Sequence, residues 1–356
     1  MRIIQILPTM AYGDAIGNHT LALNQMIENM GYETEIYAEA VDYRLPAGIA
    51  KEIRKMPEIK NQDIVLYHLS TGSELNYFVG NLKCRKIIEY HNITPPVFFN
   101  GYNSRARINA QKGLDQAHWL ADKADYCLAD SDFNRSELKQ MGYTQKIDVA
   151  PILIPFSDYD KKPSDTVLKK YDDGKTNILF TGRVAPNKKQ EDVIEAFYYY
   201  KKNINANSRL IFVGSYNGME RYYNMLRAYV EELDLLDVEF TGHIPFDEIL
   251  AYYRIADVFV CMSEHEGFCV PLIESMKFEV PVLAFASSAV PETLGNGGII
   301  LEEKNPKLTA EWIDQLVENK ELRGGIQREQ RRRLEDFQYD KVSGIYERYL
   351  KSFIED

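Results

Sequence analysis

Short apolar runs alternate with amphipathic helical patterns along the first half of the chain. A helical pattern over Leu23, Ile27 and Met30 follows the first run, and it ends at Gly31. Strands that alternate with helices at this spacing are typical of parallel sheets wrapped by crossover helices. The runs that predict strands of a first sheet are Ile3–Leu7, Glu33–Ala38, Asp63–Leu69, Lys86–His91 and Asp125–Ala129.

The second half repeats this alternation and predicts a second α/β domain. Prolines at Pro151 and Pro155, with the polar run Ser157–Ser164, suit a linker between the two halves. We therefore expect a first domain at residues 1–155, a second at 165–335 and a C-terminal helical segment at 336–356. The predicted strands of the second sheet are Asn177–Thr181, Leu210–Gly214, Val238–Gly242, Ala256–Met262, Val280–Phe285 and Gly297–Leu301.

Composition narrows the class of protein. A chain of 356 residues that is 45% hydrophobic can bury two cores. Its net charge of −11 argues against nucleic-acid binding, because contact with a phosphate backbone requires a basic face. No apolar run approaches the ~20 residues that span a bilayer, so we expect a cytoplasmic protein. The 4 cysteines lack C-x2-C spacing, which predicts neither a zinc site nor a disulfide framework.

The stretch Ser263–Val282, which reads SEHEGFCVPLIESMKFEVPV, carries the candidate chemistry. Pro271 suits the first turn of a helix that runs toward Lys277, because proline lacks an N–H and fixes φ near the helical value. The first N–H groups of such a helix are free donors beside a partial positive charge. The sequence therefore predicts an anion site, such as one for a diphosphate, at Gly267, Phe268, Cys269 and Val270.

Two glutamates bracket this anion site, Glu266 ahead of the helix and Glu274 one turn inside it. Carboxylates would repel phosphate, so hydroxyls are their expected partners, with Glu266 on a sugar and Glu274 on a ribose. A nucleotide-sugar site is the leading interpretation. In a chain this acidic, two glutamates eight positions apart also arise by chance.

The motif EGFCVPLIE from Glu266 to Glu274, with Pro281 following, resembles the E-x7-E signature of retaining glycosyltransferases of the GT-B fold, family 4. The resemblance covers nearly the whole chain and is strongest from Thr181 to Leu301. It implies two Rossmann-like domains that face each other across a cleft, with the last helix, Tyr339–Ile354, returning to the first domain. It also implies transfer of a hexose from a nucleoside-diphosphate sugar, UDP- or GDP-linked, in assembly of a bacterial cell-surface polysaccharide or glycolipid.

The G-R-x5-K pattern of this family is matched by Gly182, Arg183 and Lys188. A strand-to-helix turn would bring the two cations to the cleft, where they can neutralise a diphosphate and stabilise charge as the sugar departs. In similar proteins, residues at the positions of His243 and Ile244 hold the base. The resemblance implies neither a cofactor nor a metal, and the donor is the substrate.

Candidate residues of the first domain follow its strands. His91 lies beyond the carboxyl end of a strand, where ligands of α/β sheets collect, and it matches the family's histidine against the donor sugar. Its neighbour Asn92 would share this contact, although a structural histidine is the alternative. The resemblance places Gly13, Asp14 and Gly17 near the donor phosphates and the acceptor; a simple tight turn is the alternative.

Two further motifs have simpler interpretations. The D-x-D sequence Asp130-Ser131-Asp132 predicts a cap of the helix Asn134–Met141 through Asp132 or Ser131, and we expect no metal there. An aromatic and basic stretch follows His91, and it suits either a solvated helix or an edge for a lipid-linked saccharide acceptor at the inner membrane surface. That stretch comprises Phe98, Phe99, Tyr102, Arg105, Arg107 and Lys112.

Four other functions are alternatives to the transfer of a hexose. A phosphorylase would carry a lysine for pyridoxal phosphate in a much longer chain, and an NAD-dependent oxidoreductase would carry G-x-G-x-x-G after its first strand. A nucleotide-sugar epimerase shares the two-domain plan. A non-catalytic nucleotide-sugar-binding protein would keep the same residues, and only turnover would distinguish it.

Overall fold

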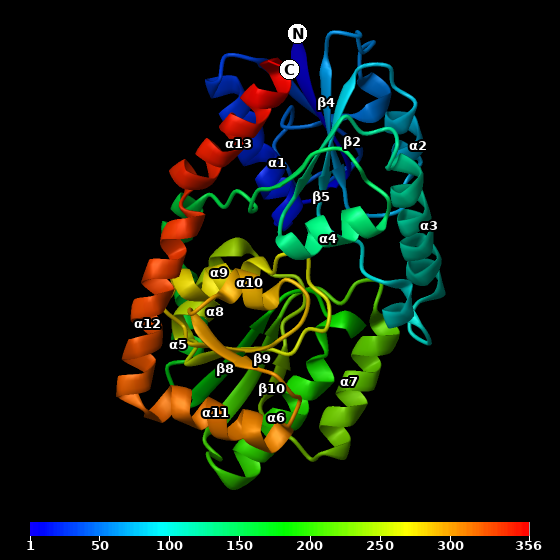
Figure 1. Ribbon diagram of the computed structural model, residues 1–356. Helices are drawn as coiled ribbons and strands as arrows, with labels where there is room; N and C mark the ends of the chain where they lie inside the picture. Colours follow the sequence, from blue (N-terminus) through cyan, green and yellow to red (C-terminus); the bar gives the residue numbers. More distant parts are fainter. Residues whose placement is uncertain (356) are drawn as a thin grey trace. The chain divides into compact units, whose positions relative to one another are not determined.

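A computed structural model describes residues 1–355, which divide into two compact units (Figure 1). The first unit comprises Met1–Val97, Arg105–Phe156 and the segment from Asp336 onward, and the second comprises Phe98–Ser104 and Ser157–Glu335. The chain passes from the first unit to the second after Phe156. This point lies within the proline-containing segment that the sequence indicates as a linker.

The segment Phe98–Ser104 differs from the sequence prediction, which assigned it to the first domain. Its side chains pack within the second unit instead. The rings of Tyr102 and Tyr222 are 5.1 Å apart in an edge-to-face contact, and the Asn103 amide donates to the Gly218 carbonyl at 2.5 Å. The aromatic residues of the predicted acceptor edge therefore belong to a different unit from the basic residues that follow them.

The first unit is built on a seven-stranded sheet in the order β3-β2-β1-β4-β5-β6-β7, with all neighbouring strands parallel. The strand order reverses between β1 and β4, which is where ligands of such sheets bind. Its strands are β1 (Arg2–Met10), β2 (Glu33–Val41), β3 (Lys51–Glu52), β4 (Ile64–Leu69), β5 (Arg85–Tyr90), β6 (Tyr126–Ala129) and β7 (Ile147–Val149). Its helices are α1 (Ala15–Asn29), α2 (Glu74–Gly80), α3 (Ser104–Leu120), α4 (Asp132–Gln140) and α13 (Tyr339–Glu355).

The second unit has a six-stranded parallel sheet in the order β10-β9-β8-β11-β12-β13, which reverses between β8 and β11. Its strands are β8 (Thr176–Thr181), β9 (Ser208–Val213), β10 (Val238–Phe240), β11 (Val258–Cys261), β12 (Val282–Phe285) and β13 (Gly298–Leu301). Its helices are α5 (Asp165–Lys170), α6 (Gln190–Asn203), α7 (Glu220–Glu232), α8 (Phe246–Ile255), α9 (Val270–Lys277), α10 (Val290–Leu294), α11 (Pro306–Glu318) and α12 (Lys320–Leu334).

The predicted class of two Rossmann-like α/β domains is confirmed, and every predicted strand overlaps an observed one. Strands β3 and β7 were not predicted, because edge strands of two and three residues are too short to show a period. The predicted cap of α4 is also present. The Asn134 N–H in the first turn of this helix donates to the Ser131 hydroxyl at 3.1 Å.

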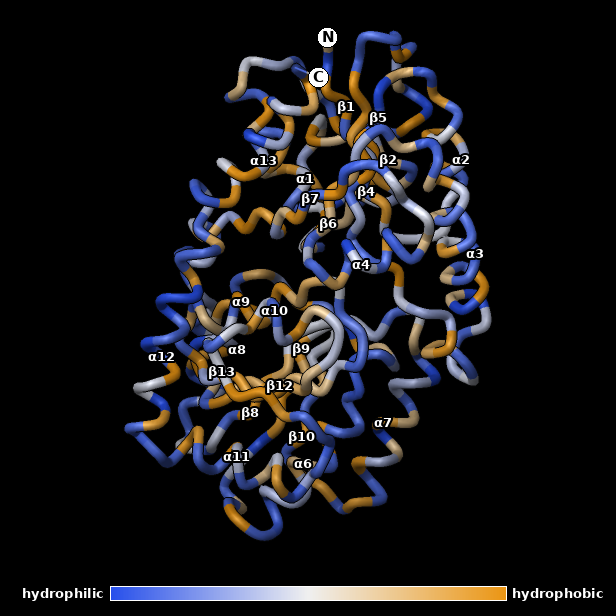
Figure 2. The backbone as a smooth tube through the Cα atoms, viewed as in Figure 1, coloured by the Kyte–Doolittle hydropathy of each residue, from blue (hydrophilic) through white to orange (hydrophobic). Residues whose placement is uncertain are grey.

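Alternating residues of the first sheet pack into separate apolar clusters on its two faces. Ile4 and Ile6 face one cluster, whereas Ile3 packs with α1 and with the final helix α13. The α13 residues Tyr346 and Leu350 are fully buried there. Figure 2 shows the strands of each sheet as mainly hydrophobic segments among more polar helices. The last helix is therefore part of the core of the first unit.

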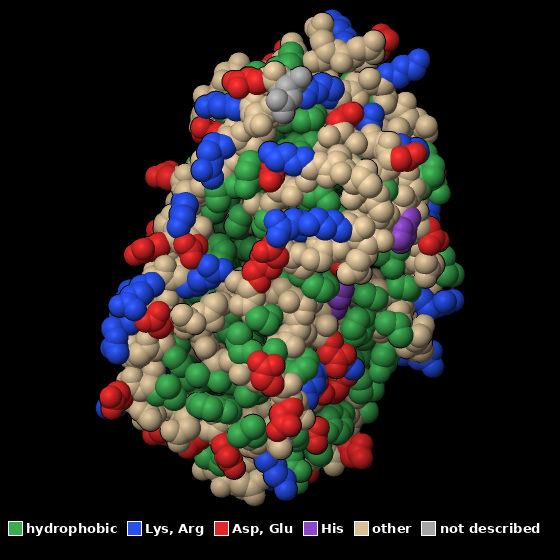
Figure 3. Space-filling model, in the orientation of Figure 1, with side chains coloured by type: hydrophobic (Ala, Val, Ile, Leu, Met, Phe, Trp, Pro, Cys, Tyr) green, Lys and Arg blue, Asp and Glu red, His purple; other side chains and the backbone are tan. Residues whose placement is uncertain are grey.

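The exposed face in Figure 3 carries basic and acidic side chains interspersed with one another. In that view, the basic side chains form no continuous basic surface. Among residues 1–355, no helix has both the length and the hydropathy that a bilayer-spanning segment requires.

Replacing Leu350 in α13 by alanine should destabilise the first unit by about 2–5 kcal/mol, because it leaves a cavity in a packed core. Urea unfolding followed by circular dichroism measures this change. Lys351→Ala is the matched control, because the Lys351 side chain, next to Leu350 in the sequence, is exposed. This substitution should change the free energy of unfolding by less than about 0.5 kcal/mol. Equal stability of the Leu350→Ala variant and the wild type would contradict this role of α13.

Candidate functional site

Two loops meet at the carboxyl ends of β8 and β11, where the strand order of the second sheet reverses. The loop after β8 carries Arg183 and Lys188, and the loop after β11 carries Glu266. Asn187 joins them: its side-chain amide donates to the His265 carbonyl at 3.0 Å. Its own carbonyl accepts from the Glu264 N–H at 2.8 Å. Adjacent parallel strands thus bring together residues that lie about 80 positions apart in the sequence.

Lys188 and Glu266 form an ion pair in which both carboxylate oxygens lie 2.5 and 2.6 Å from the ammonium nitrogen. The Lys188 side chain is 21% exposed and that of Glu266 is 8% exposed. Burial would lower the pKa of Lys188, but the Glu266 carboxylate outweighs that effect and the net pKa is raised. Lys188 is therefore a fixed cation at this end of the sheet.

The ion pair leaves hydrogen-bonding capacity on both partners. An ammonium has three N–H donors and a carboxylate about four lone-pair sites. The two contacts with Glu266 leave Lys188 one further N–H for an anion. They likewise leave lone pairs on Glu266 for hydroxyl groups of a ligand.

Arg183 is held by its backbone and exposes its side chain. Its carbonyl accepts from the Gln190 side-chain amide at 3.1 Å. Within residues 1–355, the guanidinium forms no ion pair. A positive charge that no carboxylate of the described chain neutralises is suited to binding an anionic ligand.

The preceding residue, Gly182, lies against the end of β9. Its N–H donates to the Val213 carbonyl at 2.8 Å. A Cβ on Gly214 would lie 2.0 Å from the Gly182 carbonyl oxygen, and Gly214 has φ +149°. Only glycine fits at position 214, so the backbone itself sets the path of the loop that carries Arg183.

Glu274 lies in the second turn of α9 and accepts two hydrogen bonds from tyrosines. The Tyr159 hydroxyl donates to one carboxylate oxygen at 2.7 Å, and the Tyr253 hydroxyl donates to the other at 2.6 Å. Burial raises the pKa of Glu274, although the two tyrosines oppose this shift. The tyrosines fix the carboxylate in position and leave one lone pair on each oxygen.

The predicted start of α9 is confirmed to within one residue, with Val270 as its first residue and Pro271 in the first turn. Cys269 precedes the helix with φ +74°, a left-handed conformation that turns the chain sharply into α9. The Thr293 hydroxyl donates to the Phe268 carbonyl, and the Glu266 N–H donates to the Ser288 hydroxyl at 2.8 Å. The loop Glu266–Cys269 is thus held rigidly at the amino end of the helix. Pro271 has no N–H there and the Leu272 N–H donates to the Cys269 carbonyl at 3.1 Å, which leaves the N–H groups of Cys269 and Val270 as the donors without an intrahelical acceptor among the described residues.

The residues predicted to hold a base follow β10. The backbone of Gly242 forms an isolated bridge with Gly214, which ties this loop to the loop after β9. His243 is exposed and Ile244 is half-buried. They belong to the same unit as Arg183, and their contact with a base stays a prediction.

Gly13, Asp14 and Gly17 form the turn into α1 of the first unit. Gly13 has φ +73°, and the Asp14 carboxylate caps the helix by accepting from the Gly17 N–H at 3.3 Å. A Cβ on Gly17 would lie 3.0 Å from the Ala11 carbonyl oxygen, so this glycine permits a close approach. The tight-turn interpretation accounts for these contacts, and the phosphate role stays a prediction.

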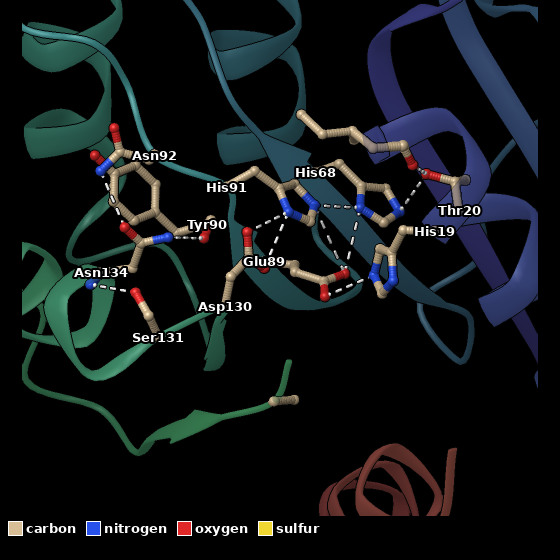
Figure 4. A network of polar contacts seen from close by, with 12 residues as sticks. His19, Thr20, His68, Glu89, Tyr90, His91, Asn92, Asp130, Ser131 and Asn134 are labelled. Atoms are coloured by element: carbon tan, nitrogen blue, oxygen red, sulfur yellow. Dashed lines mark hydrogen bonds and ion pairs between the residues drawn. The ribbon is translucent and has the colours of Figure 1, made fainter. Parts of the chain in front are cut away.

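The His91 ring lies inside the first unit, with a side-chain exposure of 0% (Figure 4). Its Nδ1 lies 2.9 Å from the Asp130 carboxylate and its Nε2 lies 2.8 Å from Nδ1 of His68. Burial opposes protonation, but the Asp130 and Glu89 carboxylates raise the pKa of His91 to about 9. Both ring nitrogens are used within the unit, so the predicted contact with a donor sugar stays a prediction.

Asn92 has φ +74° and donates from its amide to Asn134 at 2.9 Å and to Glu137 at 2.6 Å. Burial raises the pKa of Glu137 to about 7, although its contact with Tyr90 acts in the opposite direction. These contacts anchor Asn92 to α4. They give it a structural role, and its sharing of a donor contact stays a prediction.

The structure therefore separates the predicted site residues into two groups. The second unit holds Arg183, Lys188, Glu266 and Glu274 with the start of α9, and the first unit holds the turn into α1, His91 and Asn92. Of the predicted basic edge on α3, Arg105 and Arg107 are exposed, whereas Lys112 forms an ion pair with Glu74 at 2.5 Å.

Sequence reasoning did not find the polar partners of these residues. They are Tyr159 and Tyr253 beside Glu274, and His19, His68, Glu89 and Asp130 around His91. The only signal for the second group was polar residues at or near strand ends, where a buried apolar run would ordinarily continue.

Residues 163–333 match the family described as Glycosyl transferases group 1. Among curated relatives, an uncharacterized glycosyltransferase of Methanocaldococcus jannaschii is 29% identical over 183 residues, 50% of this chain and 49% of that protein. O-antigen chain mannosyltransferase B of Escherichia coli is 27% identical over 235 residues, 64% of this chain and 60% of that protein. The chain spans about half to three fifths of the length of these relatives.

Solved structures resemble the whole chain at low sequence identity. Anabaena HepE, in complex with UDP and glucose, superposes with a TM-score of 0.78 at 17% identity over 99% of this chain and 100% of that one. Sucrose-phosphate synthase of Thermosynechococcus elongatus gives a TM-score of 0.77 at 15% identity over 100% of both chains. This chain has the GT-B fold of these solved structures, and its residues 163–333 match the group 1 glycosyltransferase family.

Proposed function

We propose that the protein is a retaining hexosyltransferase that uses a nucleoside-diphosphate sugar as donor and a hydroxyl group as acceptor. The observation that carries this proposal is the arrangement at the β8 and β11 ends. The Lys188–Glu266 ion pair and the unneutralised Arg183 lie in the loops after these strands, and Glu266 and Glu274 lie on either side of the α9 start. Cations, helix N–H groups and two carboxylates match the diphosphate and hydroxyl groups of such a donor.

The difficult step in transfer is the departure of the nucleoside diphosphate, on which negative charge grows. Arg183, the spare N–H of Lys188 and the amino end of α9 would stabilise that charge. Fixed donors of this kind are each typically worth about 3 kcal/mol in the transition state. The charge of the diphosphate is then balanced by groups of the chain, and we propose that the transfer step uses no metal.

The carboxylates would take the hydroxyl groups of the donor. Glu266 would accept from hydroxyls of the transferred sugar, and Glu274 from hydroxyls of the ribose. The two tyrosines that donate to Glu274 hold its oxygens in fixed directions before a ligand binds. Preorganisation of this kind lowers the entropy lost on binding.

Relatives and structural neighbours support the choice of donor and acceptor classes. HepE was solved with UDP and with UDP-glucose, and the similar Escherichia coli protein is named as a mannosyltransferase of an O-antigen chain. We therefore propose a UDP- or GDP-linked hexose as donor and a saccharide or lipid-linked saccharide as acceptor. The product would belong to a cell-surface polysaccharide or glycolipid, made at the cytoplasmic side.

A non-catalytic nucleotide-sugar-binding protein is the second candidate, because every residue assigned here would bind a donor equally well without turnover. Release of UDP or GDP from the matching sugar, with a glycosylated product detected by mass spectrometry, supports the transferase. Tight binding without product from any saccharide or lipid-linked acceptor would favour the binding protein. Interconversion of the donor sugar would indicate an epimerase.

Replacing Arg183 by alanine should lower kcat about a hundredfold and leave the fold unchanged, because one electrostatic donor to the leaving group is lost. Its exposed side chain has no ion pair within the described chain, so the variant tests the chemistry without disturbing packing. Lys188→Ala is less suitable, because it would leave Glu266 as a buried unpaired carboxylate, a change that can cost about 3–5 kcal/mol.

Lys189→Ala is the matched control for that experiment, since Lys189 adjoins Lys188 but pairs with Glu191 and Glu264 at 3.5 and 3.6 Å. Its turnover should stay close to that of the wild type. Unchanged kcat in the Arg183→Ala variant would remove Arg183 from the proposed machinery.

Replacing Glu274 by glutamine should weaken binding of UDP or GDP about tenfold, because a charged acceptor for the ribose hydroxyls becomes neutral. Glutamine keeps one oxygen to accept from a tyrosine, so the local fold should persist. Isothermal titration calorimetry measures the change, and Glu303→Ala provides a control at an exposed glutamate of the same unit. Normal nucleotide affinity in Glu274→Gln would argue against the ribose contact.

A further inference from the structure

The first unit buries a cluster of histidines and carboxylates at the carboxyl ends of β4, β5 and β6 (Figure 4). His68 in β4 and Glu89 in β5 are register partners, His91 follows β5 directly, and His19 lies in α1. The side chains of all four have 0% exposure. One ligand atom from each lies within 4.8 Å of those of the others.

The hydrogen-bond partners of His68 fix its tautomer. Its Nε2 lies 3.0 Å from the Gln5 side-chain oxygen, whose orientation is set because the amide nitrogen of Gln5 donates to the Thr20 carbonyl at 3.2 Å. An oxygen acceptor at this position requires a hydrogen on Nε2. The Nδ1 atom of a neutral His68 therefore carries a lone pair.

The same reasoning applies to His91. Its Nδ1 faces the Asp130 carboxylate at 2.9 Å, which requires a hydrogen on Nδ1 and leaves a lone pair on Nε2 of the neutral ring. That Nε2 lies 2.8 Å from His68 Nδ1. Two nitrogens at this separation need a cation between them: a proton when His91 is protonated, which its raised pKa favours, or a metal ion that takes the place of that proton.

Glu89 supplies a third acceptor to the same point. Its Oε1 receives two hydrogen bonds, from His19 Nε2 at 2.9 Å and from the Tyr346 hydroxyl at 2.6 Å. His19 is held in this direction because its Nδ1 accepts from the Leu153 N–H at 3.0 Å. Among the described residues, no group donates a hydrogen bond to Oε2, although it is buried. This oxygen lies 3.3 Å from His68 Nδ1 and 4.0 Å from His91 Nε2.

We propose that His68 Nδ1, His91 Nε2 and Glu89 Oε2 bind one divalent transition-metal ion inside the first unit. Ligand atoms about 2.1 Å from a tetrahedral zinc ion lie about 3.4 Å apart. The three observed separations, 2.8, 3.3 and 4.0 Å, bracket that value. Small ring movements suffice to bring the three atoms into a common coordination sphere, with a water molecule as fourth ligand.

The surrounding contacts suit a metal centre. Ligating histidines commonly donate their other ring N–H to a carboxylate or carbonyl, which orients the ring. Asp130 has this role for His91, Gln5 has it for His68, and His19 together with Tyr346 orients Glu89. Two imidazoles and one carboxylate favour zinc, cobalt or nickel over magnesium or calcium, which prefer oxygen ligands alone.

None of the residues proposed to stabilise the leaving diphosphate is a ligand of this ion. Its ligands belong to the first unit, whereas the residues that would stabilise the leaving diphosphate belong to the second. The ion would join the ends of β4 and β5 at a buried point. Metal content and unfolding temperature, rather than turnover, are therefore its direct readouts.

The test uses the full chain, stripped of metal with a chelator and dialysed. Titration with zinc chloride in a calorimeter should show one saturable equivalent per chain, and zinc should raise the unfolding temperature. Cobalt chloride should give visible absorption of a nitrogen- and oxygen-ligated ion without thiolate charge-transfer bands. Magnesium chloride should produce neither effect.

Glu89→Gln is the decisive variant, because its amide oxygen still accepts from His19 and Tyr346. Its amide nitrogen would donate to His68 Nδ1, so the fold should persist. Zinc affinity should fall about a hundredfold or more in this variant, and about tenfold in Asp130→Asn, which only orients a ligand. His118→Gln, at an exposed histidine outside the cluster, should bind zinc like the wild type.

Cys261→Ser separates this site from a second group of potential ligands in the other unit, Cys261, Glu266 and Cys269. Zinc binding should be unchanged in this variant. The proposal is overturned if the wild type shows no saturable binding, or if folded Glu89→Gln binds zinc normally. Loss of binding in Cys261→Ser, or thiolate bands in the cobalt spectrum of the wild type, would also overturn it.

Discussion

The ion pair between Lys188 and Glu266 is the interaction on which the candidate donor site depends. It exists because β8 and β11 are neighbours in the sheet, although β9, β10 and the helices α6, α7 and α8 separate them in the sequence. A pair this buried adds little net stability, but loss of either partner would leave a charge without compensation. The two loops are therefore held at a fixed separation, and each partner retains hydrogen-bonding capacity toward a ligand.

Much of this site could be predicted from the sequence, since its residues lie in local patterns. The proline in the first turn of α9 and the two glutamates around it are close neighbours, and the basic residues follow a strand directly. The tyrosines that fix Glu274 could not be found in this way. Tyr159 and Tyr253 are 115 and 21 positions from Glu274, and each looks like an ordinary aromatic residue until the fold brings it close.

The buried cluster of the first unit shows the same limit more strongly. A search for metal motifs depends on fixed short spacings, but the ligands here come from two strands and the loop after the second strand. Register makes His68 and Glu89 neighbours, and register is set by the hydrophobic pattern of the whole sheet. The sequence pattern thus predicted the strands correctly, and the polar residues near their ends did not show which of them contact one another.

The two units use the carboxyl ends of their sheets in opposite ways. In the second unit, Arg183 exposes a cation and the carboxylates keep lone pairs for a ligand. In the first unit, the polar groups are directed at one another: Nδ1 of His91 faces Asp130, and its Nε2 faces His68 and the proposed ion site. Any influence of His91 on a donor sugar therefore has to pass through its charge or its backbone, because no ring nitrogen remains for a hydrogen bond.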